Sequence, residues 1–304
     1  MPELAVVVEQ CLAPVPGGAG RYAREITTAL AAQPLRGWTV RTVTAWHRDV
    51  RAAAVAGADG PHRLPAGRRA LSEVWRRGLP PGIRSDRVHA TTPLAPVWRR
   101  RRGGLITTVF DAVPWTHPET LTPRGVSWHR DIIGRSMAVA EAIVVLSTAV
   151  ADDLAGLFPS ASDRITVIPP GVTALVPPAD AAQRRRRWGI ADGYVLSVAT
   201  LEPRKGLDVL VRAMAESAVG DAQLVVVGSP GWGGVDLPTV AARAGLPPER
   251  VHVLGRVCDD DLAAVMQGAA VLAAPSRSEG FGLPVLEAMA AGLPVVCSDA
   301  PAHA

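Results

Sequence analysis

Several residue types are scarce in this chain of 304 residues, and each scarcity excludes a class of protein. The three cysteines, Cys11, Cys258 and Cys297, are too few, too far apart and odd in number for a disulfide framework or a zinc cluster. No run of about 18 apolar residues occurs, and the first residues lack the basic and apolar regions of a signal peptide. We therefore expect a cytoplasmic protein rather than a secreted or transmembrane one.

Asparagine is missing altogether, and Lys205 is the only lysine among 32 basic residues. In a chain that otherwise uses arginine, one retained lysine is a candidate functional residue. The positive charge is concentrated in the first half, because residues 1–178 carry a net charge of +7 and residues 179–304 one of −3. This imbalance favours an anionic partner for the first half.

The length is about twice that of one domain, and short apolar runs alternate with helical patterns almost throughout. This alternation predicts an α/β protein of two doubly wound, Rossmann-like domains that face each other across a cleft. We place the boundary after the proline-containing segment 172–178, which gives domains of residues 1–178 and 179–304. The chain ends directly after its last predicted strand, and we expect the second domain to be incomplete there.

The individual elements follow from the same patterns. Strands are expected at Leu4–Val8, Thr39–Thr44, Arg87–Ala90, Leu105–Phe110, Ala142–Leu146, Ile165–Ile168, Tyr194–Val198, Gln223–Val227, Val251–Leu254, Ala270–Ala274 and Pro294–Cys297. Helices are expected at Arg21–Ala32, Arg69–Arg76, Pro123–Val139, Ala149–Leu157, Leu207–Ala215, Leu237–Ala244, Asp259–Gln267 and Leu283–Ala291. Ligands bind at the carboxyl ends of the strands in such sheets, so the turns after the strands are the places to search.

The turn after the first strand is rich in glycine. Gly18, Gly20 and Ala23 fit the dinucleotide pattern G-x-G-x-x-A, in which the backbone approaches a phosphate at a helix start. The pattern also needs an acidic residue after the second strand, and none comes before Asp49. A nicotinamide cofactor is therefore disfavoured, while a plain tight turn and a contact to an anion or a sugar both stay open.

The second half opens with a strand and a turn that carries two cations, Arg204 and Lys205. A guanidinium beside an ammonium suits a diphosphate and stabilises the charge that the diphosphate gains when it leaves. A solvated pair in a loop is the alternative. Because Lys205 is the only lysine, we favour the functional interpretation.

The segment 275–294 follows a buried strand and contains two carboxylates, Glu279 in the turn and Glu287 on the next helix. Gly280 and Gly282 leave backbone N–H groups available near the helix start, where an anion is favoured. A carboxylate on the helix can accept both hydroxyls of a ribose, and one in the turn can accept sugar hydroxyls. Caps and surface carboxylates are the alternative.

The segments 202–206 (Glu-Pro-Arg-Lys-Gly) and 279–287 (Glu-Gly-Phe-Gly-Leu-Pro-Val-Leu-Glu) together closely resemble the retaining glycosyltransferases of family 4, which have the GT-B fold. Residues 16–21 resemble the glycine-rich loop of that family, and 165–172 resemble its interdomain segment. The resemblance extends over nearly the whole chain. It implies transfer of a hexose, with mannose and glucose as guesses, from a nucleotide-diphosphate sugar to an acceptor hydroxyl in glycan, polysaccharide or glycolipid synthesis.

The resemblance assigns roles to single residues. Arg204 and Lys205 match the cations on the donor diphosphate, Glu287 matches the ribose-binding carboxylate, and Glu279 matches the carboxylate near the transferred sugar. We predict Glu279, Arg204 and Lys205 as the catalytic residues. The predicted donor-binding set is Gly18, Arg204, Lys205, Glu279, Phe281, Gly282 and Glu287.

The acceptor side departs from the family pattern. Members often carry His-Asp after the strand that we place at 105–110, whereas this chain has Phe110 and Asp111. We predict Gly20, His89 and Asp111 as acceptor-side candidates, with a structural role as the alternative for His89. An inactive nucleotide-sugar-binding protein and a nucleotide-sugar 2-epimerase on the same fold are the alternatives to transfer.

The implied partners are a nucleotide sugar and a glycan or lipid-linked acceptor, with no cofactor and no metal, since Asp259–Asp261 matches a helix start rather than an Asp-x-Asp metal site. Two arginine runs, Arg99–Arg102 and Arg184–Arg187, are unassigned. A solvated surface, a phosphorylated acceptor and peripheral contact of Trp98–Arg102 with the anionic inner face of the cell membrane are the candidates. Nucleic acid is not expected, because no recognition module is evident.

Overall fold

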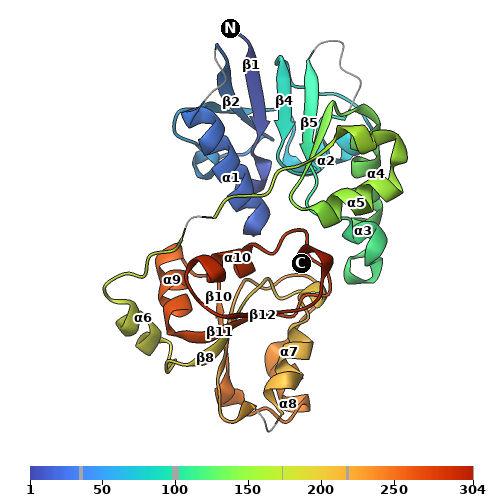
Figure 1. Cartoon of the computed structure of the whole chain (residues 1–304). Coiled ribbons are helices and arrows are strands. Elements are labelled where there is room, and N and C mark those ends of the chain that lie inside the picture. The colour runs from blue at the N-terminus through green and yellow to red at the C-terminus, as the bar shows by residue number, and fades with distance from the viewer. Residues whose placement is uncertain (34–36, 98–102, 173, 217–218, 304) are drawn as a thin grey trace. The chain divides into compact units, whose positions relative to one another are not determined.

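The computed structural model describes the chain except for residues 34–36, 98–102, 173, 217–218 and 304 (Figure 1). The chain divides into two compact units, each with its own core. Unit 1 is Met1–Pro118 with Thr122–Pro170, and unit 2 is Glu119–Leu121 with Gly171–Ala304. The domain boundary between residues 178 and 179 stays a prediction.

Unit 1 contains a parallel sheet of seven strands in the order β3-β2-β1-β4-β5-β6-β7. The strands are β1 (Glu3–Val7), β2 (Thr39–Thr44), β3 (Asp59–Arg63), β4 (Arg87–Ala90), β5 (Gly104–Thr108), β6 (Ala142–Val145) and β7 (Ile165–Val167). Its helices are α1 (Gly17–Ala32), α2 (Arg68–Arg76), α3 (Val113–Thr116), α4 (Pro123–Val139) and α5 (Thr148–Leu157).

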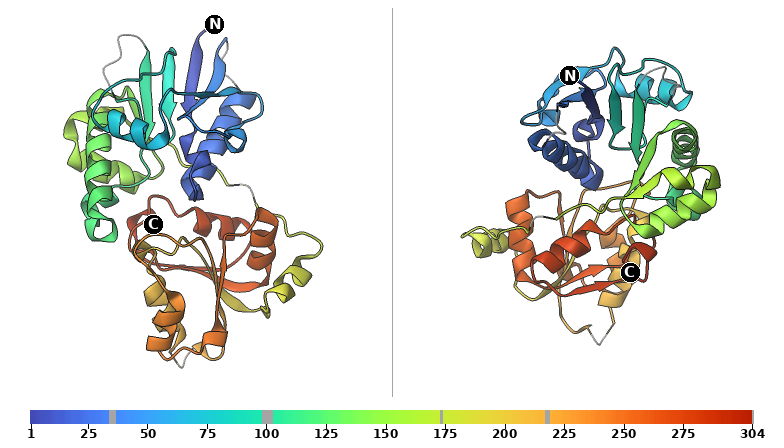
Figure 2. Two further views of the ribbon diagram at one scale, coloured as in Figure 1. Left: turned by 180° about the vertical axis from the view of Figure 1, so that it is seen from behind. Right: turned by 45° about the horizontal axis from the view of Figure 1, so that its top comes forward.

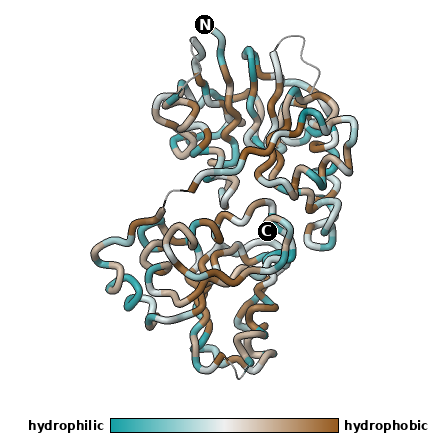
Figure 3. Tube along the Cα trace, viewed as in Figure 1, coloured by the Kyte–Doolittle hydropathy of each residue, from teal (hydrophilic) through white to brown (hydrophobic). Residues whose placement is uncertain are grey.

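Alternation along β1 explains why both faces of this sheet are covered. Ala5 and Val7 pack into the larger core cluster with residues of α2, α4 and α5, whereas Val6 and Val8 pack into a second cluster with Ala23 of α1. Successive side chains of a strand point to opposite faces of the sheet. An unbroken apolar run therefore needs a layer of helices on each face to bury it. Hydrophobic segments follow the strands in Figure 3, as this arrangement requires.

Unit 2 contains a parallel sheet of five strands in the order β10-β9-β8-β11-β12. The strands are β8 (Tyr194–Val198), β9 (Leu224–Val227), β10 (Val251–Gly255), β11 (Ala269–Ala274) and β12 (Val295–Cys297). The helices are α6 (Ala181–Arg187), α7 (Leu207–Met214), α8 (Leu237–Arg243), α9 (Asp259–Gly268) and α10 (Leu283–Ala290). In both views of Figure 2, helices flank the strands of each unit.

Strand β9 is buried on both faces in the same way. Leu224 and Val226 pack with residues of α7 and α8, and Val225 and Val227 pack with residues of α9 and α10. The four residues therefore separate two apolar layers. The α/β fold with doubly wound parallel sheets, expected from sequence, is confirmed.

The strand order of each sheet reverses at one point, between β1 and β4 in unit 1 and between β8 and β11 in unit 2. In unit 2 the register pairs Leu272 with Leu196, so the carboxyl ends of β8 and β11 lie side by side. The carboxyl end of a doubly wound sheet at such a switch point is where a ligand binds. These are the turns that carry Arg204, Lys205 and Glu279.

Some elements differ from those expected. Helix α1 begins at Gly17 instead of Arg21, so Gly18 and Gly20 lie in its first turn rather than in a loop before it. Strand β3 was not expected, because its sequence Asp-Gly-Pro-His-Arg has no apolar alternation. The short helices α3 and α6 were not expected either, since neither is long enough to show an apolar period.

The two arginine runs have different outcomes. Residues 98–102, the predicted membrane contact, lie outside the described residues. Arg184–Arg187 forms the last turn of α6, where Arg185 is 5% exposed and donates to Asp192, to Gln267 and to the carbonyl of Ala264 on α9. Arg185 therefore docks α6 onto α9. The alternative that the whole run Arg184–Arg187 is a solvated surface is wrong, because Arg185 is buried. No helix in the described part of the chain is long and apolar enough to cross a membrane.

Candidate functional site

The turn after β8 contains a single 3₁₀ turn, Pro203–Lys205, that ends at Gly206. Gly206 has a φ of 64°, and a Cβ atom there would lie 2.1 Å from the carbonyl oxygen of Pro275. Only glycine combines this left-handed conformation with such a close approach. Gly206 thus lets the turn after β8 rest on the end of β11, which brings Arg204 and Lys205 to the neighbouring turn.

The turn after β11 contributes Glu279, which collects several donors. Its Oε1 accepts from Lys205 Nζ at 2.5 Å and from Ser276 Oγ at 2.7 Å, and its Oε2 accepts from an Arg204 guanidinium nitrogen at 3.3 Å. The same Arg204 nitrogen donates to the carbonyl oxygen of Ser278 at 2.8 Å. The two turns are therefore joined by charged hydrogen bonds, which are the strong kind.

This cluster is largely withdrawn from water, since the side chains of Lys205 and Glu279 are 14% and 12% exposed. Burial by itself raises the pKa of Glu279, but the charges of Lys205 and Arg204 and the hydrogen bonds outweigh it and bring that pKa to about 2. Burial lowers the pKa of Lys205, and the Glu279 charge opposes that shift only in part. At neutral pH Glu279 is an ionised hydrogen-bond acceptor and not a proton donor.

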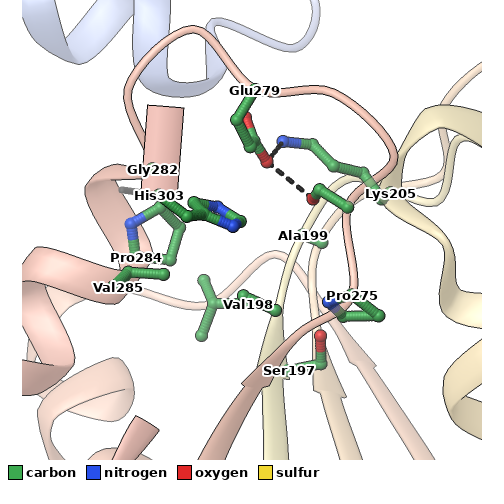
Figure 4. A pocket seen from close by; sticks show the side chains of 12 residues that line it. Ser197, Val198, Ala199, Lys205, Pro275, Glu279, Gly282, Pro284, Val285 and His303 are labelled. Atoms are coloured by element: carbon green, nitrogen blue, oxygen red, sulfur yellow. Dashed lines mark hydrogen bonds and ion pairs between the residues drawn. The ribbon is translucent and has the colours of Figure 1, made fainter. Parts of the chain in front are cut away.

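A pocket lies beside this cluster, at the carboxyl ends of β8 and β11 (Figure 4). Its wall is built entirely from unit 2 and combines strand ends, the Ser276–Gly282 turn, the start of α10 and the segment after β12. The lining residues are Ser197, Val198, Ala199, Lys205, Ala274, Pro275, Ser276, Glu279, Gly282, Pro284, Val285 and His303.

Three of the predicted donor residues, Lys205, Glu279 and Gly282, line this pocket, and Arg204 is bonded to Glu279. Glu287 is on α10 as expected and is 7% exposed, but neither it nor Phe281 belongs to the lining set. The role of each residue stays a prediction.

Most of the other lining residues were not predicted, among them the polar residues Ser276 and His303. Ser276 has a recognisable signal, because a hydroxyl three residues before a carboxylate in a turn is well placed to bond to it. His303 has no such signal, since only the fold brings it beside Gly282.

The acceptor-side candidates belong to unit 1. Of these, Gly20 is buried in the first turn of α1; Gly18, predicted to bind the donor, lies in the same turn and is exposed. His89 on β4 is buried and lies 2.9 Å from Thr108 Oγ1, and burial lowers its pKa to about 4. Asp111 accepts a hydrogen bond from the backbone N–H of Val113, at the start of α3. His89 is therefore uncharged at neutral pH, and Asp111 stabilises a helix start.

The aromatic ring of Phe110 stands at the position where the family often has histidine. It packs edge-on against Tyr22 of α1 with ring centroids 5.4 Å apart. The Tyr22 hydroxyl lies 3.2 Å from Thr108 Oγ1, which also contacts His89. Phe110 thus joins the end of β5 to α1 by an apolar contact.

No group of three or more His, Cys, Asp and Glu side chains that could hold a metal ion occurs among the residues described. Of the acidic run at the start of α9, Asp261 is bonded to Arg184 at 2.7 Å. That carboxylate serves the contact between α6 and α9.

Two family models match the chain in consecutive segments. One, described as Glycosyltransferase Family 4, matches residues 16–174, which is more than half of the chain. The chain belongs to glycosyltransferase family 4. The other model, Glycosyl transferases group 1, matches residues 181–304, where all donor candidates of this family 4 chain except Gly18 lie.

Curated relatives share sequence with part of this family 4 chain. The D-inositol 3-phosphate glycosyltransferase of Stackebrandtia nassauensis is 37% identical over 182 residues, which cover 55% of this chain and 41% of that protein. The O-antigen chain mannosyltransferase B of Escherichia coli is 31% identical over 201 residues, covering 64% of this chain and 52% of that protein. The matched part therefore spans about half of each relative or less.

Solved structures match nearly the whole chain. Sucrose-phosphate synthase from Thermosynechococcus elongatus superposes with a TM-score of 0.70 at 22% identity, covering 99% of this chain and 82% of that one. Anabaena HepE in complex with UDP and glucose gives a TM-score of 0.69 at 19% identity, covering 100% and 82%. WaaG, a glycosyltransferase involved in lipopolysaccharide biosynthesis, gives 0.64 at 22% identity, covering 98% and 80%. The GT-B fold expected for this family 4 chain is thereby confirmed.

Proposed function

We propose that this family 4 chain is a retaining glycosyltransferase that moves a hexose from a nucleotide-diphosphate sugar to an acceptor hydroxyl in glycan synthesis. The observation that carries the proposal is the buried cluster of Arg204, Lys205 and Glu279 beside a pocket at the switch point of unit 2. A crevice at such a point is where doubly wound sheets bind nucleotides. Arg204 and Lys205 bring N–H donors to the pocket that suit a diphosphate, while the carboxylates of Glu279 and of Glu202, 4.0 Å from Arg204, balance their charge.

The two cations have a clear role in such a transfer. As the anomeric C–O bond of the donor breaks, its electron pair stays on the diphosphate, and Lys205 and Arg204 stabilise that charge. The acceptor oxygen attacks the same carbon from the same face, and its proton passes to the leaving diphosphate oxygen. Glu279, with its pKa held at about 2, stays ionised and accepts hydrogen bonds from hydroxyls of the transferred sugar.

The solved relatives support the donor class. Anabaena HepE is in complex with UDP-glucose in one structure and with UDP and glucose in another. The names of the curated relatives describe transfer to an inositol phosphate and to an O-antigen chain. For this chain we propose UDP-glucose or GDP-mannose as donor and a glycan or lipid-linked acceptor. We also propose peripheral contact with the inner face of the cell membrane, supported by the net charge of +7 over residues 1–178.

The direct test is a donor panel on the purified chain. We expect one nucleotide sugar to raise the thermal midpoint and to release its nucleoside diphosphate when a suitable acceptor is present, with the anomeric configuration kept in the product. Failure of every nucleotide sugar to bind would contradict the proposal. Formation of an epimer without acceptor would support a 2-epimerase instead.

Substitutions separate the proposed roles. Lys205→Met removes a charged contact worth about 1.5–3 kcal/mol and should lower turnover by about tenfold or more.

Glu287→Gln should weaken the binding of the nucleoside diphosphate itself, while Glu279→Gln should spare that binding and lower transfer. Arg186→Met, at an exposed position of α6, is the control and should change neither. Equal effects of the two glutamate variants on nucleoside diphosphate affinity would refute the assignment.

A further inference from the structure

The segment after β12 places His303 in the wall of the pocket. Residues Pro301–His303 form a short 3₁₀ turn, and the imidazole lies against Gly282 at the start of α10 (Figure 4). A Cβ atom at Gly282 would be 2.9 Å from His303 Cδ2, so glycine leaves the space that the ring occupies. The ring therefore shares a wall with Lys205 and Glu279.

The hydrogen bonds of the ring fix the place of its proton. His303 Nδ1 lies 3.2 Å from the carbonyl oxygen of Ser298 and 3.4 Å from its Oγ. Ser298 Oγ in turn donates to the carbonyl oxygen of Ser276 at 2.5 Å. Because a carbonyl oxygen only accepts, Nδ1 carries the proton, and Nε2 of the neutral ring has a lone pair.

The Nε2 atom is buried and has no hydrogen-bond partner within the part of the chain that the structure describes. A buried polar atom without a partner destabilises the folded protein, so such an atom in a pocket wall indicates a group that arrives with a ligand. The lone pair requires that this group be a donor, such as a hydroxyl.

We propose that His303 Nε2 accepts a hydrogen bond from a hydroxyl of the sugar that the donor transfers. The inference rests on the proposed function, because it needs a nucleotide sugar in this pocket. For a ring that carries its proton on Nδ1 alone, a phosphate oxygen is the wrong partner, since two lone pairs repel each other, and the cations Arg204 and Lys205 are present for the phosphates. Glu279, the predicted contact of the sugar, lines the same pocket. His303 is then a sugar-contacting residue that recognises one hydroxyl.

The experiment compares a nucleotide sugar with its nucleoside diphosphate on the full chain. Calorimetric titrations use UDP-glucose with UDP and GDP-mannose with GDP, on wild type, His303→Leu and His303→Gln. His303→Leu should weaken binding of the nucleotide sugar by about three- to tenfold, the range for one hydrogen bond, and change binding of the nucleoside diphosphate by less than about twofold. His303→Gln keeps an acceptor of similar reach and should retain most of the affinity.

A matched control is available in the same unit. His252 on β10 also has a buried Nε2 without a partner among the described residues, but it does not line the pocket. His252→Leu should therefore leave both affinities unchanged, and thermal midpoints of all variants show that they are folded.

Each outcome decides the inference. Loss of nucleotide-sugar affinity confined to His303→Leu supports it. Equal weakening of UDP and UDP-glucose, or unchanged affinities in His303→Leu, overturns it while the proposed function stands, because wild type still binds. Failure of wild type to bind any nucleotide sugar overturns both.

Discussion

At the residue scale, Glu279 makes the stability of unit 2 depend on pH. Burial acts to raise its pKa, yet Lys205 and Arg204 hold it at about 2, below the ordinary value of 4.5. The folded state therefore binds fewer protons than the unfolded state between these two values. The stabilisation is complete above about pH 4.5 and is lost as the pH falls toward 2.

This dependence is testable by urea unfolding of wild type and Glu279→Gln between pH 3 and 7. Wild type should be the more stable protein at pH 7, because the amide cannot pair with two cations. The difference should shrink below about pH 4.5, with a slope of at most about 1.4 kcal/mol per pH unit for one proton. A difference that stays constant over this range would show that folding does not lower the pKa of Glu279.

Gly206 supports a second prediction. Gly206→Ala forces a Cβ atom against the carbonyl oxygen of Pro275 in addition to the strained φ of 64°. Gly245 has a similar φ of 72° but open space around it, so Gly245→Ala measures the cost of conformation alone. We expect the free energy of unfolding, measured with urea, to fall by about 1 kcal/mol in Gly245→Ala and by at least about 2 kcal/mol in Gly206→Ala.

Donor binding distinguishes the same two variants. Only Gly206→Ala should weaken nucleoside diphosphate binding, since only that turn positions Lys205. Equal stability losses in both variants would mean that the turn moves away from Pro275 without cost.

At the scale of elements, two arginines hold α6 against α9: Arg184 pairs with Asp261, and the buried Arg185 donates to the carbonyl of Ala264. Arg185→Ala leaves the carbonyl of Ala264 without this charged donor and removes the pairing with Asp192. We expect a loss of about 2–3 kcal/mol in the free energy of unfolding. Arg186→Ala, one residue further and exposed, should change it by less than about 0.5 kcal/mol. Similar values for the two variants would refute the docking role.

Elements with a clear period were predictable, and those set by tertiary contacts were not. β2, β4, β8 and α4 have the bounds expected from sequence. β3 has no apolar alternation and exists because it pairs with β2. The same division holds for side chains.

In the candidate site, Arg204, Lys205 and Glu279 were found from charge types at the ends of predicted strands, and the structure places them together. His303 and the burial of Arg185 depend on contacts between segments far apart in sequence. No local pattern encodes those contacts.

At the scale of the whole molecule, the two halves of the sequence differ in charge. Residues 1–178 carry +7 and residues 179–304 carry −3. Each arginine near an anionic membrane contributes about 1 kcal/mol, screened over a Debye length of about 8–10 Å in physiological salt. The chain should therefore co-sediment with vesicles that contain anionic lipid, and added salt should release it.

Replacing Arg99–Arg102 by glutamine tests the segment that we predict to make this contact. The variant should lose most of the co-sedimentation while keeping its affinity for nucleoside diphosphates, which depends on unit 2. Equal recovery on neutral and anionic vesicles would contradict a membrane role for these arginines.

The pairing of β8 with β11 also sets the time at which the protein could bind the donor that we propose. The cations follow β8 and Glu279 follows β11, and more than seventy residues of chain, including β9 and β10, separate the two turns. During synthesis on the ribosome, the cation-bearing turn leaves the exit tunnel long before its carboxylate partner exists. Binding of the proposed nucleotide sugar would then begin only after β11 has joined β8, and its appearance would report that this long-range pairing of unit 2 is complete.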